Sequence, residues 1–235
     1  MSLAWCKCRD KVYHKMSTAL AETEKTTILW ATLFLLTACS AVLYLSRCSW
    51  YGIPHLIGLN DVLISAMLLH RVAPLCSLTM LIHDRELKRQ PCRFVWHGKH
   101  LAVVPDAFLV IQVILTDGRK LDIAVLIEHD NGNEFGERFR NKLHAIHAML
   151  QAEAYKERFG VEYVTVAFTT FKGPKRCDRM REVACEVLGN DVNTYAQVFL
   201  FTAQTPAPDP KHLWLGPCWY SLLSDQPVSF REKEV

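Results

Sequence analysis

The spacing of apolar and polar positions changes several times along the chain, and each change predicts a boundary between elements. Residues 62–69 carry apolar side chains at helical spacing, with Asn60 or Asp61 as the helix cap and Pro74 just beyond the end. A second amphipathic helix is expected from about residue 77 to residue 88. Two helices therefore open the predicted main domain.

After these helices, the pattern changes to that of β-strands and then alternates between helix and strand. Stretches rich in β-branched and aromatic residues predict strands at 93–96, 107–114 and 121–128, and residues 116–119 have the composition of a hairpin turn. The later elements are expected as a helix at 134–158, a strand at 161–168, a helix at 174–188 and a strand at 197–201. This order predicts an α/β fold with a mixed central sheet flanked by helices.

An uncharged, apolar run at residues 26–46 predicts an additional helix near the N-terminus. The run is long enough to cross a bilayer, and Trp30 and Tyr44 stand near its two ends, as interfacial aromatic residues do. A buried helix of a soluble domain is the alternative, because threonine, cysteine and serine interrupt the run. We therefore divide the chain into an N-terminal segment, 1–52, and a main domain, 53–235.

The composition is that of a folded protein and identifies no partner by itself. Half of the 235 residues are hydrophobic and 22% are charged, which excludes a disordered tail, a collagen-like fibre and a low-complexity array. The nine cysteines are odd in number and lack a CxxC pair, so we expect reduced thiols and a cytoplasmic location. No GxSxG, Walker or dinucleotide-binding motif is present.

The candidate chemistry lies in acidic residues at the ends of two predicted strands. Asp106 begins one strand of the predicted hairpin and Glu128 lies near the end of its partner, so antiparallel pairing places both carboxylates at one end of the sheet. Two adjacent carboxylates are costly unless a cation lies between them, which indicates a Mg²⁺ site. Asp130, two residues further on, faces the same side. Lys142, on the following helix, can stabilise a bound phosphate.

Basic residues also gather around the start of the helix predicted at 174–188. They form either a solvated helix face or a surface that contacts phosphates. The members are Lys172, Lys175, Arg176, Arg179 and Arg181.

Several of these motifs together resemble the bacterial replication-relaxation family, whose proteins are associated with plasmids and mobile DNA. The resemblance spans about residues 53–222 and rests on Pro105-Asp106-Ala107, residues 127–134, Lys142 and residues 55–61. It implies a restriction-endonuclease-like core, similar to the PD-(D/E)xK nuclease fold, with DNA as a partner. It also implies a DNA-binding winged helix ahead of that core.

The chain departs from the family pattern in two places. Asp130 stands where a standard PD-(D/E)xK site has lysine, so either Lys142 has taken over that role or the site is degenerate. The apolar run at 26–46 stands where the winged helix would be, as a membrane anchor or as the remnant of a DNA-binding domain.

Two functional hypotheses follow from the resemblance and its departures. In the first, the protein is a Mg²⁺-dependent DNA nuclease or nickase of plasmid or mobile-element replication, with Asp106, Glu128 and Asp130 as metal ligands and Lys142 as the fourth catalytic residue. In the second, it is a non-catalytic DNA- or protein-binding module with the same fold, either with or without a membrane tether at residues 26–46.

Overall fold

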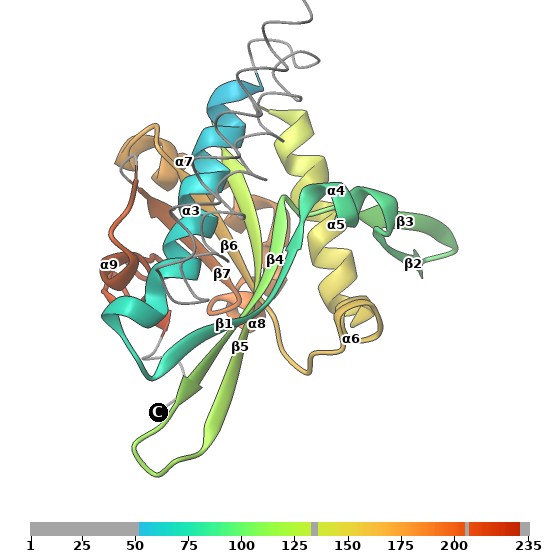
Figure 1. The fold of residues 1–235 in the computed structure, drawn as a ribbon. Helices are drawn as coiled ribbons and strands as arrows, with labels where there is room; N and C mark the ends of the chain where they lie inside the picture. Colours follow the sequence, from blue (N-terminus) through green and yellow to red (C-terminus); the bar gives the residue numbers. More distant parts are fainter. Residues whose placement is uncertain (1–51, 133–135, 205–206, 231–235) are drawn as a thin grey trace, which may run out of the picture. The chain divides into compact units, whose positions relative to one another are not determined.

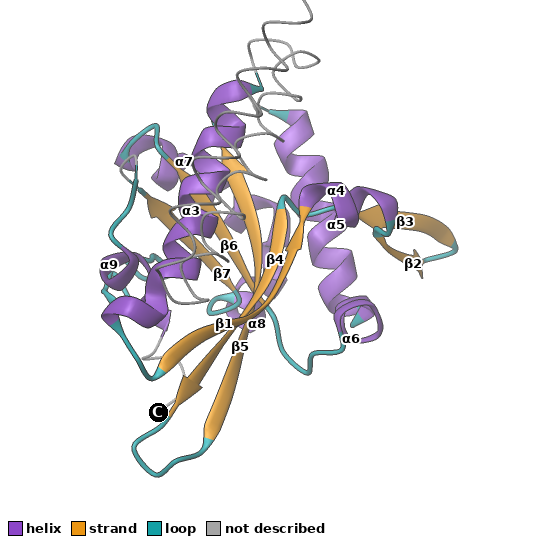
Figure 2. Cartoon of the chain, viewed as in Figure 1, coloured by secondary structure: helices purple, strands orange, loops and turns teal. Residues whose placement is uncertain are grey.

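The computed structural model describes residues 52–132, 136–204 and 207–230. These residues form a mixed α/β arrangement around a five-stranded sheet, with helices on both faces (Figures 1 and 2). The predicted helix at 26–46 lies outside the described residues.

The elements follow one another in an order that alternates for much of its length. They are α3 (Ile53–Val72), β1 (Cys76–His83), α4 (Asp84–Arg89), β2 (Cys92–Trp96), β3 (Lys99–Val103), β4 (Ala107–Ile114), β5 (Lys120–Asp130), α5 (Glu137–Gln151), α6 (Ala154–Phe159), β6 (Thr165–Thr170), α7 (Pro174–Leu188), the 3₁₀ turn η2 (Gly189–Asp191), α8 (Val192–Tyr195), β7 (Phe199–Ala203) and α9 (Pro210–Leu215).

The central sheet has the strand order β1-β4-β5-β6-β7, and β2 and β3 form a separate hairpin. The β4–β5 hairpin is antiparallel and pairs Ala107 with Ile127 at one end and Ile114 with Lys120 at the other. β6 and β7 then add in parallel to β5. As a result, the start of β4 and the ends of β5, β6 and β7 lie at the same end of the sheet.

β1 is the edge strand next to β4 and pairs with it in antiparallel fashion. Its register shifts between Leu78 and Met80, and the intervening Thr79 hydroxyl donates to the carbonyl oxygen of Val110 at 3.2 Å. At the outer edge of β7, Phe201 forms an antiparallel bridge with Tyr220.

Two apolar clusters cover the two faces of the sheet. On one face, Phe108, Leu126 and Phe168 pack against α5 and α7. On the other, alternate residues of the same strands pack against α3 and the C-terminal residues around α9. Strands β4 and β5 are apolar on both faces because both faces are covered.

Local sequence explains the best-defined boundaries. The turn between β4 and β5 uses Asp117, which accepts a hydrogen bond from the Arg119 backbone N–H, and Gly118, whose φ of +83° favours glycine. α7 begins with Pro174, whose fixed φ suits a first helical turn. The predictions of strand 107–114 and helix 174–188 are confirmed.

The prediction of a helix at 77–88 is wrong. Most of that segment is strand β1, and only Asp84–Arg89 is helical. Its leucine and methionine residues favour a helix, but pairing with β4 overrides this local preference. Asn60 and Asp61 are not caps either, because α3 begins at Ile53 with Pro54 in its first turn.

The helix predicted at 134–158 is divided into α5 and α6. The break contains Glu153, a non-glycine residue with φ of +49°, so the helix cannot continue through it. The strand predicted at 161–168 is β6, displaced to Thr165–Thr170. Strand β3 and helix α9 were not predicted.

Helix α3 is apolar and, by length and composition alone, long enough to cross a membrane. One side of it is buried against the sheet through Leu59, Val62, Ala66 and Leu69. The cysteines of the described residues are all thiols, at positions 76, 92, 177, 185 and 218.

Candidate functional site

Asp106 is held at the start of β4 by the neighbouring strand. Its backbone N–H donates to the carbonyl oxygen of Ile127 at 3.0 Å, and its Oδ2 accepts from the backbone N–H of His129 at 2.8 Å. About 20% of its side chain is exposed. The carboxylate is therefore fixed in direction while one oxygen remains available to a second partner.

That second partner is His55, in the first turns of α3. Its Nε2 lies 3.3 Å from Asp106 Oδ1. Burial alone would lower the pKa of His55, but the hydrogen bond and charge of Asp106 outweigh it and raise that pKa. Burial alone would raise the pKa of Asp106, but the contacts with His55 and the charge of Lys142 lower it. Each group therefore favours the charged form of the other.

Glu128 lies near the end of β5, with only 3% of its side chain exposed. Its Oε2 accepts a hydrogen bond from Lys142 Nζ at 2.8 Å, and Lys142 is 27% exposed on α5. The charge of Lys142 also acts on both Asp106 and His55. The structure thus brings Asp106, Glu128 and Lys142 together, as the sequence predicted, and adds His55.

Asp130 has a different set of partners. Arg176 of α7 donates to it through two nitrogens, Nε and Nη2, each at 2.8 Å, and the Thr170 hydroxyl donates at 3.2 Å. Both carboxylate oxygens of Asp130 are therefore engaged in joining β5 to α7. These contacts offer no support for Asp130 as a metal ligand, and that role stays a prediction.

His129 points to the opposite face of β5 from Glu128 and Asp130. Its Nδ1 lies 2.8 Å from the Thr169 hydroxyl, and within the described part of the chain its Nε2 has no hydrogen-bond partner. Burial, assisted by the charge of His55, lowers the pKa of His129 to about 4. The ring is therefore neutral near pH 7.

The His129 ring rests directly on Gly58 of α3. A Cβ atom on Gly58 would stand 2.1 Å from His129 Nε2, far inside van der Waals contact. A glycine in the middle of a helix is explained here by this close approach. Strand alternation could have placed His129 opposite Glu128, but no local signal identifies Gly58 or His55 as its neighbours.

The acidic pair suits one type of metal site. Among the residues described, no group of three or more histidine, cysteine or acidic side chains is arranged to hold an ion. Mg²⁺, however, is commonly bound by one or two carboxylates together with water and substrate phosphates. Asp106 and Glu128 are carboxylates of the kind that could hold such an ion, and a Mg²⁺ site here stays a prediction.

Much of the predicted basic cluster is engaged within the protein. Arg176 binds Asp130, Arg179 binds Glu182, and Arg181 donates to the carbonyl oxygens of Ser221 and Ser224. Lys172 Nζ lies 4.8 Å from the centre of the Phe171 ring. Of this set, Lys172, Lys175 and Arg179 are exposed, and only the two lysines are near the end of β6.

Comparison of the chain with protein-family models, with curated proteins and with solved structures gives no match.

Proposed function

We propose that this protein is a Mg²⁺-dependent nuclease or nickase that cleaves DNA, of the type to which the replication-relaxation resemblance points. The observation that carries the proposal is the contact between Lys142 Nζ and Glu128 Oε2 at 2.8 Å, together with the charge of Lys142 acting on Asp106. A lysine pointing into solvent would instead have favoured a site without chemistry.

Asp106 and Glu128 are the residues that would hold the metal ion, and the ion would supply electrostatic stabilisation of a phosphate and activation of water. Lys142 replaces the lysine that a PD-(D/E)xK site carries where this chain has Asp130. Its ammonium group can stabilise negative charge that builds on the scissile phosphate. His129 orients Asp106 through its backbone N–H.

Asp130 then supports the site through position rather than through ligation. Its ion pair with Arg176 fixes the end of β5 against α7, two residues beyond Glu128. We also propose that the sheet is a restriction-endonuclease-like core. This proposal is supported by the positions of two acidic residues, one at the start of β4 and one near the end of the antiparallel β5.

The experiment is a cleavage assay on supercoiled plasmid and on single-stranded DNA with Mg²⁺ or Mn²⁺. We expect Glu128→Gln and Lys142→Met to lower the cleavage rate about 100-fold or more, because the first removes the charge of a proposed metal ligand and the second removes the cation proposed to stabilise the phosphate. Matched controls exist on the same strand: Asp122→Asn and Lys120→Met change exposed groups at the opposite end of β5 and should leave the rate unchanged.

Calorimetric titration with Mn²⁺ separates metal binding from turnover. Asp106→Asn should abolish binding while the fold, followed by circular dichroism, is retained. Equal cleavage by the folded Glu128→Gln variant and the unaltered protein would exclude this site.

A second candidate function is a DNA- or protein-binding module that retains the fold without the chemistry. It is favoured by the full engagement of Asp130 with Arg176 at the position where a catalytic lysine would stand. If the unaltered protein binds DNA but does not cleave it in the presence of metal ions, this alternative is supported.

A further inference from the structure

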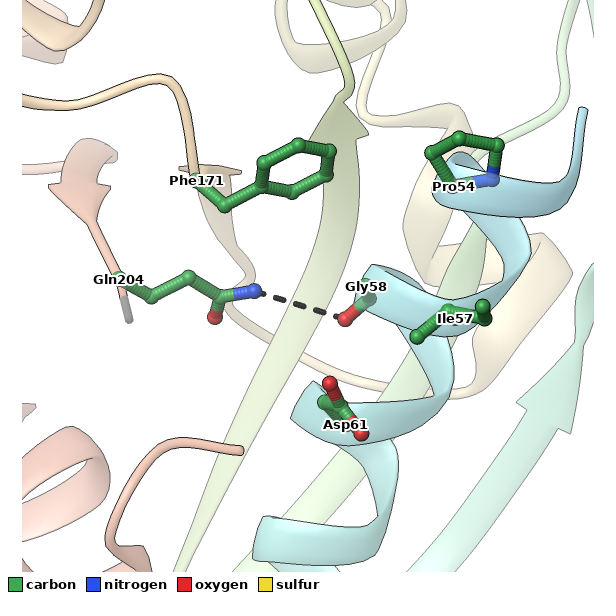
Figure 3. Close-up of a pocket in the computed structure, with 6 residues that line it drawn as sticks. All are labelled: Pro54, Ile57, Gly58, Asp61, Phe171 and Gln204. Atoms are coloured by element: carbon green, nitrogen blue, oxygen red, sulfur yellow. Dashed lines mark hydrogen bonds between the residues drawn. The ribbon is translucent and has the colours of Figure 1, made fainter. Parts of the chain in front are cut away.

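A pocket of about 250 Å³ lies beside the acidic site and plays no part in the chemistry described above. Three segments that are distant in sequence contribute its walls: the first turns of α3, the residue that follows β6 and the residue that follows β7 (Figure 3). The lining residues are Pro54, Ile57, Gly58, Asp61, Phe171 and Gln204. The pocket thus lies beyond the carboxyl ends of parallel strands, where α/β sheets commonly bind ligands.

The walls combine flat apolar surface with hydrogen-bond acceptors. Pro54, Ile57 and the Phe171 ring provide the apolar part (Figure 3). The polar part comes from the Gln204 amide, just beyond β7, and from the Asp61 carboxylate on α3 (Figure 3). A ligand that fits both parts is planar and apolar on its faces, with polar groups along one edge.

Gln204 contributes a buried hydrogen-bond acceptor to the pocket. Only 8% of the residue is exposed, and its Nε2 donates to the carbonyl oxygen of Gly58 at 3.4 Å, which fixes the orientation of the amide. Among the residues described, its Oε1 has no hydrogen-bond partner. A buried acceptor without a donor is costly, so the ligand should bring an N–H group.

The Asp61 carboxylate adds a second hydrogen-bond acceptor to the pocket lining. Its Oδ2 accepts the backbone N–H of Ala207 at 3.3 Å. Two acceptors in the pocket lining favour a ligand with an amino group and disfavour a ligand edge made of carbonyl oxygens.

The pocket is connected to the acidic site through His129. Gly58, which forms part of the wall, packs directly against His129, and the Phe171 and His129 rings lie 5.5 Å apart between centroids. The backbone N–H of His129 in turn holds Asp106. Lys172 Nζ, 4.8 Å from the centre of the Phe171 ring, adds positive charge where a phosphate could pass.

We propose that this pocket binds one unstacked nucleobase of a single-stranded segment of nucleic acid and selects bases that carry an exocyclic amino group, such as adenine and cytosine, over thymine, which has none. The base packs against Phe171, and its exocyclic amino group donates to Gln204 Oε1 and the Asp61 carboxylate. The proposal deepens the proposed function and rests on it, because the strand that supplies the base also brings a phosphate to Asp106 and Glu128.

The test measures binding of labelled 12-nucleotide oligo-dA, oligo-dC and oligo-dT to the full chain by fluorescence anisotropy in EDTA. Phosphate contacts are the same for the three strands, so a difference in affinity reports on the base. We expect oligo-dA and oligo-dC to bind about tenfold more tightly than oligo-dT, which is the size expected for an unmatched buried acceptor.

Three variants locate the effect. Gln204→Met should bring the three affinities to within about twofold of one another by removing the acceptor. Phe171→Ala should weaken all three strands by about tenfold through loss of stacking. Tyr163→Ala, which alters an aromatic residue that is 81% exposed, is the matched control and should change nothing.

Because Gln204 is buried, each variant is first checked for folding by thermal denaturation. If Gln204→Met does not fold, Asp61→Asn at the same wall provides the second test, with a reduced preference for adenine and cytosine expected. Equal affinity of the unaltered protein for all three strands, or an unchanged preference in both folded variants, would overturn the proposal.

Free nucleotides are the other source of the same chemistry. Binding of deoxyadenosine monophosphate as tightly as oligo-dA would overturn the assignment to a strand, whereas much weaker binding supports it. The assay contains no metal, so a failure of cleavage leaves the base preference intact, and a missing base preference leaves the cleavage result intact.

Discussion

Gly58 and His129 form a close packing contact between α3 and β5, the strand that carries Glu128. The glycine allows the imidazole ring to approach the helix backbone, and the ring fills the space that a side chain at position 58 would take. The same residue, His129, fixes Asp106 through its backbone N–H. Substitution of Gly58 should therefore alter the position of His129 and, through its backbone N–H, that of Asp106.

We expect Gly58→Ala to lower the free energy of unfolding by about 1–3 kcal/mol, because the new methyl group overlaps the His129 ring. Urea denaturation measures the change. The double variant Gly58→Ala/His129→Ala should recover part of the loss, since the second change removes the ring. Additive effects of the two substitutions would contradict the proposed contact.

His129 should also make stability depend on pH. Its pKa in the folded protein is about 4, against 6.5 when unperturbed. Between these values the unfolded chain binds a proton that the folded protein does not, so stability should fall as pH falls from 6.5 towards 4, by roughly 3 kcal/mol in all. Denaturation in EDTA at several pH values should show this loss and a smaller one in His129→Gln.

His55 has the opposite effect on the pH dependence of stability. The His129→Gln variant therefore retains His55. Asp106 raises its pKa, and the stabilisation it contributes is therefore present at low pH and lost as pH rises through the raised value. Parallel curves for His129→Gln and the unaltered protein would show that His129 does not cause the acid sensitivity.

Helix α7 is joined to the sheet by an ion pair as well as by apolar packing. Arg176 makes two hydrogen bonds to Asp130, and only 13% and 5% of the two side chains are exposed. On the next helix, Arg140 of α5 also pairs with Glu186 of α7. Removing one partner should destabilise the protein more in the buried pair than in the exposed pair, because the remaining charge has little access to water.

We expect Arg176→Met to lower the free energy of unfolding by about 3–5 kcal/mol, since it leaves the Asp130 carboxylate buried without its partner. Asp130→Asn/Arg176→Met removes both charges and should recover much of that loss. Arg179→Met is the control, because Arg179 binds Glu182 at the exposed surface of the same helix. Equal losses for Arg176→Met and Arg179→Met would contradict a special role for the buried pair.

The chain could be interpreted from sequence where local signals and tertiary contacts agree. The apolar run of β4, the Asp117-Gly118 turn and Pro174 at the start of α7 each have a local cause. The pairing of β4 with β5 then places Asp106 beside Glu128. Lys142 follows from its place in α5.

Other features depend on contacts that sequence spacing does not reveal. β1 is a strand only because β4 lies beside it. Arg176 reaches Asp130 across 46 positions, and His55 reaches Asp106 only once α3 has packed on the sheet. Gln204 and Gly58 meet across 146 positions. These links belong to the tertiary arrangement, and the last three lie at the end of the sheet that carries the candidate site.

The shifted register of β1 has a consequence for solubility. An exposed edge strand presents unpaired backbone groups that can recruit a strand from another molecule and begin aggregation. The irregularity between Leu78 and Met80 interrupts that row, and Met80 is 42% exposed beside it. At the opposite edge, the bridge from Phe201 to Tyr220 covers β7. The sheet therefore ends on both sides in features that discourage further strands from joining it.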